Sequence, residues 1–415
     1  MHPAKYLDKW LSENFSKIWR NSSTAPRILG RRATALAEQE EFHQLGEMLV
    51  KRMFLAMEHA KPIQFHLLDR DESGAWVIWP AQCYGVLLTR GLVQNIQVAC
   101  GQAERLLGSA LREGQARNFL SDLWGKLPND EDHRTAFGGL LAHVAFAFVV
   151  HHELAHAGLG HEGADKAAYT RSAARPDDHA LFDGLDILDE WAAAAAERDL
   201  SPERRIRSQA LEADADVNGL IYTRQFMQEQ ARKFQSTTVA CDDSMGVVWE
   251  TLLTSDANRD LVVCIGVVIG LLSLLPDFAL KELGNLDVST HPPIPARILT
   301  LLHIDRQLET ANSGGDNMTN AILIAAALID MVISMERLIA EGSGAPLASN
   351  LPTDKAPVSS LDRALERISI PESVSRFDDI GVHMKALALE MKSLELTTRQ
   401  YRRFPDWMRF VWYLS

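Results

Sequence analysis

The sequence feature that most constrains this chain is an apolar run that leads directly into two closely spaced histidines. The run AFAFVVHHELAHAGLGHE covers residues 145–162 and contains His152-Glu153-Leu154-Ala155-His156. On a helix, residues i and i+4 lie one turn apart on the same face, so the two histidines can direct their imidazoles at one point. Glu153 follows the first histidine, where it reaches a water on a bound metal but not the metal itself. This HExxH pattern is typical of zinc peptidases, which use two nitrogen ligands and a carboxylate as general base.

A zinc site of this kind needs one more protein ligand and an open position for water. Residues 205–228 are predicted to be a helix and contain LEADADVNGL, in which Glu212 and Asp216 lie four residues apart on one face. Glu212 is therefore the predicted third ligand. Asp216 is predicted to accept from the outer N–H of a liganding histidine and to fix its tautomer. Asp214 lies on another face and is a poorer ligand. Without HExxH, a solvated acidic helix face would be the ordinary interpretation of this segment. Gly219 is expected to let the helix pack closely on a neighbour.

A different third-ligand pattern, HExxHxxGxxH, does not fit this chain. Leu159 and Glu162 stand where that pattern requires glycine and histidine, and His161 comes one place too early. If Glu212 is not the ligand, Glu162, His161 and His179 are the next candidates. His179 lies in an acidic, alanine-rich segment, whose many carboxylates are most simply a solvated face.

The segment VSTHPPIPARILTLLHIDR at 288–306 carries two further candidates. His291 precedes a double proline, which holds it in extended backbone. Arg297 opens the next predicted helix. Either side chain, if close to the metal, could donate to the oxyanion that forms when water attacks a peptide carbonyl. Read alone, this segment would be a loop with a surface histidine.

The charge and cysteine content restrict the partners and the compartment. The chain has 415 residues and a net charge of −13 at pH 7, which disfavours nucleic acid and anionic membranes as partners. Its four cysteines form no CxxC pair, which indicates a reducing compartment and a metal site without sulfur. The N-terminus lacks the apolar stretch of a secretory signal, so we expect a cytoplasmic protein.

One uncharged stretch raises the question of a membrane span. LVVCIGVVIGLLSLL at 261–275 is bounded by Asp260 and by Pro276-Asp277. A spanning helix needs roughly 20 apolar residues. The stretch is shorter, so we predict a buried core helix, as we do for residues 322–333.

The remaining pattern is mostly helical. Helices are expected near residues 33–59, 93–126 and 135–158, and an N-terminal stripe is formed by Tyr6, Trp10, Phe15 and Trp19. Residues 62–90 are rich in β-branched and aromatic residues between turn signals and predict two or three short strands. An edge strand of such a sheet can pair with an extended substrate, or the sheet can simply pack on the metal helix. Gly158 and Gly160 suit the end of that helix.

Four segments in order resemble the minigluzincin zinc peptidases, the family of HtpX-type heat-shock peptidases, CAAX prenyl proteases and mitochondrial inner-membrane stress peptidases. The segments are ESGAWVIWPAQCYGVLLTRGLV, HELAHAGLGH, EADADVNGL and STHPPIPARI, which together span about residues 62–305. The resemblance implies Glu212 as third ligand, Asp216 as its supporting carboxylate, and roles for His291 and Arg297. The family is mostly membrane-embedded or exported, whereas this chain shows neither a span nor a signal. Its first 60 and last 110 or so residues have no counterpart.

We therefore expect a mainly α-helical protein with a small β-sheet (α+β), in which a zincin-like metallopeptidase core carries added N- and C-terminal helices. The expected parts are an N-terminal helical segment (1–60), the metallopeptidase domain (61–341, with the acidic insert at 161–200), a linker (342–360) and a C-terminal helical segment (361–415). The last part ends in an aromatic tail, YRRFPDWMRFVWYLS, which is expected to fold back into a groove or to bind a regulatory partner.

The expected activity is that of a zinc-dependent endopeptidase with one Zn²⁺ per chain, bound by His152, His156 and Glu212, and with Glu153 as general base. Its substrate would be a protein or peptide, and a covering segment could keep it latent. Two alternatives stay open: a cytosolic HExxH peptidase of the phage-exclusion type, and a non-catalytic binding or regulatory module that zinc stabilises.

Overall fold

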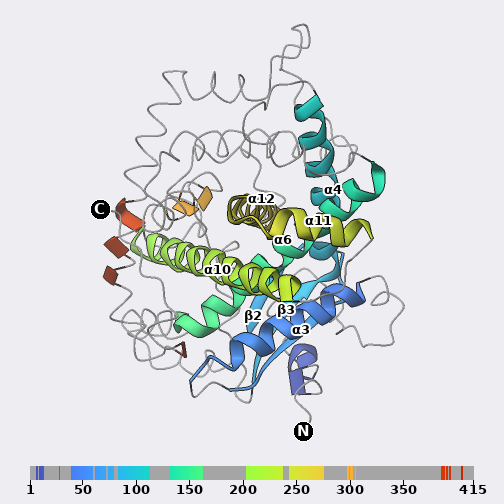
Figure 1. Cartoon of the computed structure of the whole chain (residues 1–415). Helices are drawn as coiled ribbons and strands as arrows, with labels where there is room; N and C mark the ends of the chain where they lie inside the picture. The colour runs from blue at the N-terminus through green and yellow to red at the C-terminus, as the bar shows by residue number, and fades with distance from the viewer. Residues whose placement is uncertain are drawn as a thin grey trace, which may run out of the picture.

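The structure of the protein is a computed structural model that describes residues 39–58, 61–71, 73–78, 83–112, 130–161, 202–236 and 243–274. It also describes shorter pieces: 6–7, 9–13, 28, 297–298, 300–301, 304, 385–387, 389–390, 392–393 and 403–404. These residues form long helices around one small sheet (Figure 1). The predicted class, mainly α with a small β-sheet, is confirmed.

The sheet has three strands, as the sequence allowed. They are β1 (Ile63–Leu68), β2 (Ala75–Ile78) and β3 (Tyr84–Thr89). Their order is β1-β3-β2, with β3 parallel to β1 and antiparallel to β2. The two edge strands, β1 and β2, therefore both precede the central strand, β3, in the chain. A bridge from Ile28 to Leu68 adds to the β1 edge.

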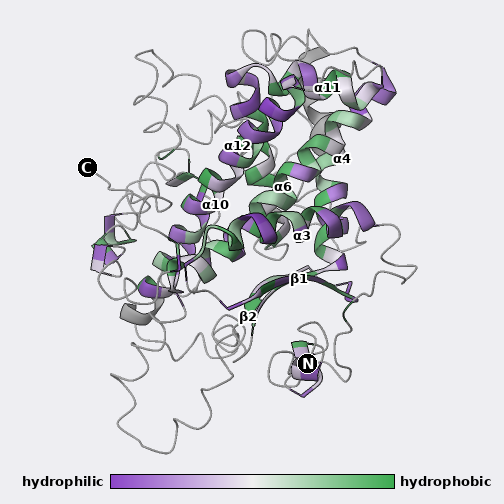
Figure 2. Cartoon of the chain, turned by 60° about the horizontal axis from the view of Figure 1, so that its bottom comes forward, coloured by the Kyte–Doolittle hydropathy of each residue, from purple (hydrophilic) through white to green (hydrophobic). Residues whose placement is uncertain are grey.

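Both faces of the sheet are covered, because its residues alternate between two apolar clusters. Phe65, Val77 and Val86 belong to the main core, whereas Trp76, Ile78 and Leu87 pack with Leu7 and Leu11 of the N-terminal helical piece. Figure 2 shows the sheet as a layer with α3 (Glu40–Phe54) and the other helices on one side and the N-terminal piece on the other. Burial on both faces explains why the strands read as nearly continuous apolar runs.

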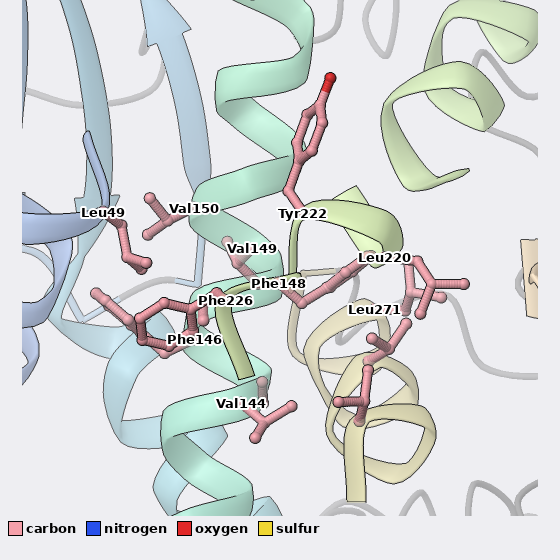
Figure 3. Close-up of a cluster of buried hydrophobic side chains, with 14 of the residues drawn as sticks. Leu49, Val144, Phe146, Phe148, Val149, Val150, Leu220, Tyr222, Phe226 and Leu271 are labelled. Carbon is pink, nitrogen blue, oxygen red and sulfur yellow. The ribbon is translucent and has the colours of Figure 1, made fainter. Parts of the chain in front are cut away.

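The helix α6 (Glu131–Leu159) is the element on which the others pack. It contacts α3, α4 (Arg90–Arg112), α10 (Pro202–Ser236), α11 (Ser244–Leu253), α12 (Asp256–Leu274) and two strands of the sheet. Every residue from 144 to 159 is buried. Figure 3 shows apolar side chains of α6 between Leu49 of α3 and Leu220 and Leu271 of α10 and α12. A helix that is apolar all round is a core helix, which is what the run at 145–162 predicts.

The ends of α6 follow ordinary capping rules. The Asp130 carboxylate accepts from the backbone N–H of His133, and Gly160 has the left-handed conformation, with a φ of 79°. The prediction that Gly160 suits the end of the helix is confirmed. Gly158 lies inside the last turn. α4 begins directly after β3, where the Thr89 hydroxyl accepts from the backbone N–H of Leu92.

The uncharged stretch at 261–275 lies largely in α12, whose side chains are mostly buried against α6. The prediction of a core helix is confirmed for its described residues. Among the described helices, α6 alone has the length and apolar composition to cross a membrane. Of the 18-residue apolar stretch of α6 that meets this criterion, 83% is buried inside the protein. Such burial is what a core helix shows.

The helices α3, α4, α6 and α10 occur where helices were predicted, and the helical residues 385–387, 389–390 and 392–393 fall within the predicted C-terminal helical segment. Several predictions lie outside the described residues: Phe15, Trp19, Glu162, His179, His291, residues 162–200 of the acidic insert, the helix at 322–333 and the linker at 342–360.

Candidate metal centre

The site lies where α10 crosses α6, and a glycine sets the spacing of the two helices. A Cβ built on Gly219 would lie 3.2 Å from both the backbone nitrogen and the Cα of His152. The prediction of a close helix approach at Gly219 is therefore confirmed. Glu212 and Asp216 precede this glycine by seven and three residues, so they lie on the same face of α10 and meet the histidines of α6.

Three side chains converge at this crossing. The Nε2 atoms of His152 and His156 lie 3.2 Å apart. Oxygens of the Glu212 carboxylate lie 3.4 Å from Nε2 of His152 and 3.2 Å from Nε2 of His156. Ligands held about 2.0–2.1 Å from a tetrahedral zinc ion are separated by roughly 3.3–3.4 Å. The donor set and its spacing therefore fit a divalent metal ion, as the grouping of these three residues indicates.

The charge of the surroundings favours a cation. Among the described residues at the site, the carboxyl side chains are those of Glu153, Glu212, Asp214 and Asp216, and the guanidinium that contacts them is that of Arg297; all five side chains are buried. Four carboxylates and one guanidinium leave an excess of negative charge when the histidines are neutral. Buried charge of this kind is normally balanced by a counter-ion or a metal.

The pKa values of the two histidines reflect the same field. Burial lowers the pKa of His152, but the carboxylates of Asp216 and Glu212 outweigh it and raise the pKa to about 10. Burial likewise lowers the pKa of His156, and the carboxylate of Glu212, with a smaller contribution from Glu153, raises it above the ordinary value. The carboxylates that raise these pKa values would equally favour a bound cation.

A carboxylate and a guanidinium stand behind His152. Nδ1 of His152 lies 3.0 Å from an oxygen of Asp216. Nε and Nη2 of Arg297 donate to the two oxygens of Asp216, each at 2.6 Å. This pair is bidentate and almost fully buried. Burial raises the pKa of Asp216, but the Arg297 guanidinium and His152 hold it below its ordinary value.

A second line of polar groups stands behind His156. Nδ1 of His156 lies 2.8 Å from Nδ1 of His161, and Nε2 of His161 lies 3.1 Å from an oxygen of Asp214. The side-chain amide of Asn218 donates to the other oxygen of Asp214 at 3.0 Å and to its backbone carbonyl at 2.9 Å. The sequence pattern predicts no role for Asp214 or Asn218, and it offers His161 only as an alternative ligand.

The signal that could have found this second line is weak. His161 follows the left-handed Gly160 at the end of α6, and Asp214 lies two residues from Glu212. Spacing along one helix does not show that side chains of two helices meet. The triad within metal-binding distance contains His152, His156 and Glu212, and not His161 or Asp214.

The remaining predicted residues have different outcomes. Glu153 is buried beside His152. Arg297 lies against Asp216, with a longer approach of 3.7 Å to Glu212. In the structure, two nitrogens of Arg297 donate to the Asp216 carboxylate. The donation of Arg297 to an oxyanion therefore stays a prediction. His291 lies outside the described residues.

Comparison of the chain with protein-family models, with curated proteins and with solved structures returns no match. The chemistry of the site is therefore argued from its own residues.

Proposed function

We propose that this protein is a zinc-dependent endopeptidase of the HExxH, gluzincin type. The observation that carries the proposal is the convergence of His152, His156 and Glu212 to within 3.2–3.4 Å of one another in a buried site. The glutamate that directly follows His152 distinguishes this arrangement from a structural metal site, which has no use for a fourth ionisable group that is not a ligand.

The metal would be held by Nε2 of His152, Nε2 of His156 and the carboxylate of Glu212. A bound zinc ion would supply Lewis acidity, which lowers the pKa of water to about 7 and polarises a peptide carbonyl. Zinc is the proposed ion because the donors are two imidazoles and one carboxylate, although related sites accept other divalent ions.

Glu153 is the proposed general base. It takes a proton from the attacking water as the oxygen–carbon bond forms, and it passes that proton to the leaving amine as the carbon–nitrogen bond breaks. Asp216 and Arg297 hold His152 in place. His291 or Arg297 is the proposed donor to the oxyanion.

The proposed substrate is a protein or peptide. The proposed location is the cytoplasm, because the four cysteines form no CxxC pair and suggest a reducing compartment. A regulatory partner at the C-terminal tail and a latent state remain part of the proposal.

The test compares full-length wild type with Glu153→Gln, both loaded with zinc to the same measured content. Each is incubated with fluorescein-labelled casein and with a peptide library whose new termini are read by mass spectrometry. We expect wild type to cut and Glu153→Gln to cut about 10²- to 10⁴-fold more slowly, the usual contribution of a general base. Equal cleavage by both would refute the mechanism.

The alternatives give different results in the same experiment. A zinc-stabilised binding module would bind zinc in both forms and cut nothing in either. A peptidase of the phage-exclusion type would share the dependence on Glu153 and differ only in its substrate, which the peptide library would show.

A further inference from the structure

We propose that His161, held by Asp214, is a positioning residue that fixes His156 as the tautomer able to bind metal. The inference rests on the metal site of the proposed function and deepens it. It assigns a role to a buried line of side chains, Asn218–Asp214–His161–His156, that the catalytic proposal does not use.

The hydrogen bonds limit the number of protons on the line. Two imidazole nitrogens at 2.8 Å, Nδ1 of His156 and Nδ1 of His161, must share one proton, since one nitrogen donates and the other accepts. The direction of this hydrogen bond decides which nitrogen of His156 keeps a lone pair. It therefore decides whether the Nε2 atom that faces Glu212 can bind a metal.

Asp214 sets that direction. Its Oδ2 lies 3.1 Å from Nε2 of His161, and a carboxylate can only accept, so His161 carries its proton on Nε2. A neutral imidazole carries one proton, so it has one donor nitrogen and one acceptor nitrogen. Nδ1 of His161 is then an acceptor, and Nδ1 of His156 donates to it.

Asn218 fixes the carboxylate at the start of the line. Its amide nitrogen donates both to Oδ1 and to the backbone carbonyl of Asp214, so the amide orientation is determined by two acceptors. With one oxygen of Asp214 occupied by Asn218, the other is aimed at His161. These hydrogen bonds assign the protons along the line. They leave a lone pair on Nε2 of His156, and this lone pair is available to the metal.

The two liganding histidines are thus supported in different ways. His152 has a carboxylate directly behind it, and that carboxylate is paired with a buried guanidinium. His156 has its carboxylate one imidazole further away, supported by a neutral amide. Partners of this kind orient the ligand and raise its basicity, and their loss typically costs 10- to 100-fold in metal affinity.

The test measures zinc affinity by competition with a chromophoric chelator, and the visible absorption of the Co²⁺-loaded protein, in the full chain. We expect His161→Phe, which removes the acceptor for His156, to weaken zinc binding about 10- to 100-fold and to change the Co²⁺ spectrum. His161→Gln should recover part of both, since its amide offers one acceptor and one donor.

The matched control is His151→Phe, the same change at a buried histidine of the same helix. His151 lies against the Thr223 hydroxyl, with 3.0 Å between Nδ1 and Oγ1, and its ring packs on the rings of Tyr222 and Phe226. We expect this variant to keep the wild-type zinc affinity and Co²⁺ spectrum, even if its thermal stability falls. A loss equal to that of His161→Phe would show a general packing effect and overturn the inference.

If His161→Phe does not fold, the variant Asp214→Asn tests the same inference. His161 and Asn218 each donate to one oxygen of the Asp214 carboxylate, whereas an amide has one acceptor oxygen, so zinc binding should weaken in this variant too. Wild-type affinity in a folded His161→Phe, or in Asp214→Asn, would refute the role of the line while leaving the metal site intact. Absence of zinc binding by wild type would refute the proposed function itself.

Discussion

At the scale of single residues, the site contains a buried ion pair, Asp216–Arg297, whose disruption should be costly in free energy. Both side chains are about 1% exposed, and the guanidinium donates twice to the carboxylate. Breaking a buried pair by removing one partner typically costs about 3–5 kcal/mol, because the other charge is left buried without compensation.

We therefore predict a large coupling between these two positions. Arg297→Met and Asp216→Leu should each lower the free energy of unfolding by about 3–5 kcal/mol, whereas the double variant should lose much less than the sum of the two. Denaturant unfolding of the four proteins in the metal-free state measures this. Additive losses would show that the pair does not act as a unit.

The two histidines could be predicted to face one point because their i, i+4 geometry is local to one helix. Glu212 lies on a second helix, so it was predicted from the need of such a site for a third ligand and from the family resemblance, not from local geometry. The role of His161 could not be predicted. It depends on where Asp214 of α10 lies relative to the residues that follow α6. Nothing in the local pattern relates Asp214 to His161.

At the scale of helices and strands, the crossing of α6 and α10 determines the site. Gly219 lies against the backbone of His152 itself, so an added side chain cannot be accommodated by rotating a flexible group. Any shift of α10 at this point moves Glu212 relative to the two histidines.

We predict that Gly219→Ala weakens zinc binding and lowers the melting temperature, since the new Cβ would lie 3.2 Å from the backbone of His152. Gly101→Ala in α4 is the control, because a Cβ there meets nothing within 4 Å. The control should be neutral or more stable by up to about 1 kcal/mol, the gain in helix propensity. Both are measured by thermal unfolding and zinc titration. Equal behaviour of the two variants would contradict the account of the crossing.

Helices and strands were predictable where the pattern is strong, as in α6 and α12, whose apolar runs match core helices. The order β1-β3-β2 was not predictable. It requires β1 to pair with the strand after next, and strand patterns do not show which strands pair. The choice between substrate pairing and simple packing for the sheet edges stays open for the same reason.

At the scale of the whole molecule, the C-terminal part of the chain reaches the end of the metal helix. The backbone N–H groups of Arg403 and Phe404 donate to the carbonyl of Gly158 at 2.8 and 3.0 Å, and the Arg403 carbonyl accepts from Glu58. The ring of Phe404 is buried beside Tyr222 and occupies the space that a Cβ of Gly158 would need. These two residues of the tail therefore pack against the end of α6, and the prediction that the whole tail folds back into a groove stays a prediction.

We predict that Phe404→Ala lowers the free energy of unfolding by about 3–5 kcal/mol, the usual cost of removing a buried phenylalanine. Leu389→Ala, at a leucine that is 72% exposed in another C-terminal piece, should have little effect. Denaturant unfolding measures both. Unchanged stability of Phe404→Ala would show that the contact of Phe404 with α6 does not stabilise the fold. A rise in cleavage per bound zinc in the same variant would support the proposal that the C-terminal tail covers the site and keeps the enzyme latent.

The central claim is the metal centre, and the most direct measurement is the metal content of the purified chain by mass spectrometry. Wild type is compared with His156→Ala and Glu212→Ala after exposure to zinc and removal of the excess. The account predicts about one zinc per chain in wild type and a clear loss in both variants. Zinc retained in Glu212→Ala, or no zinc in wild type, would contradict it.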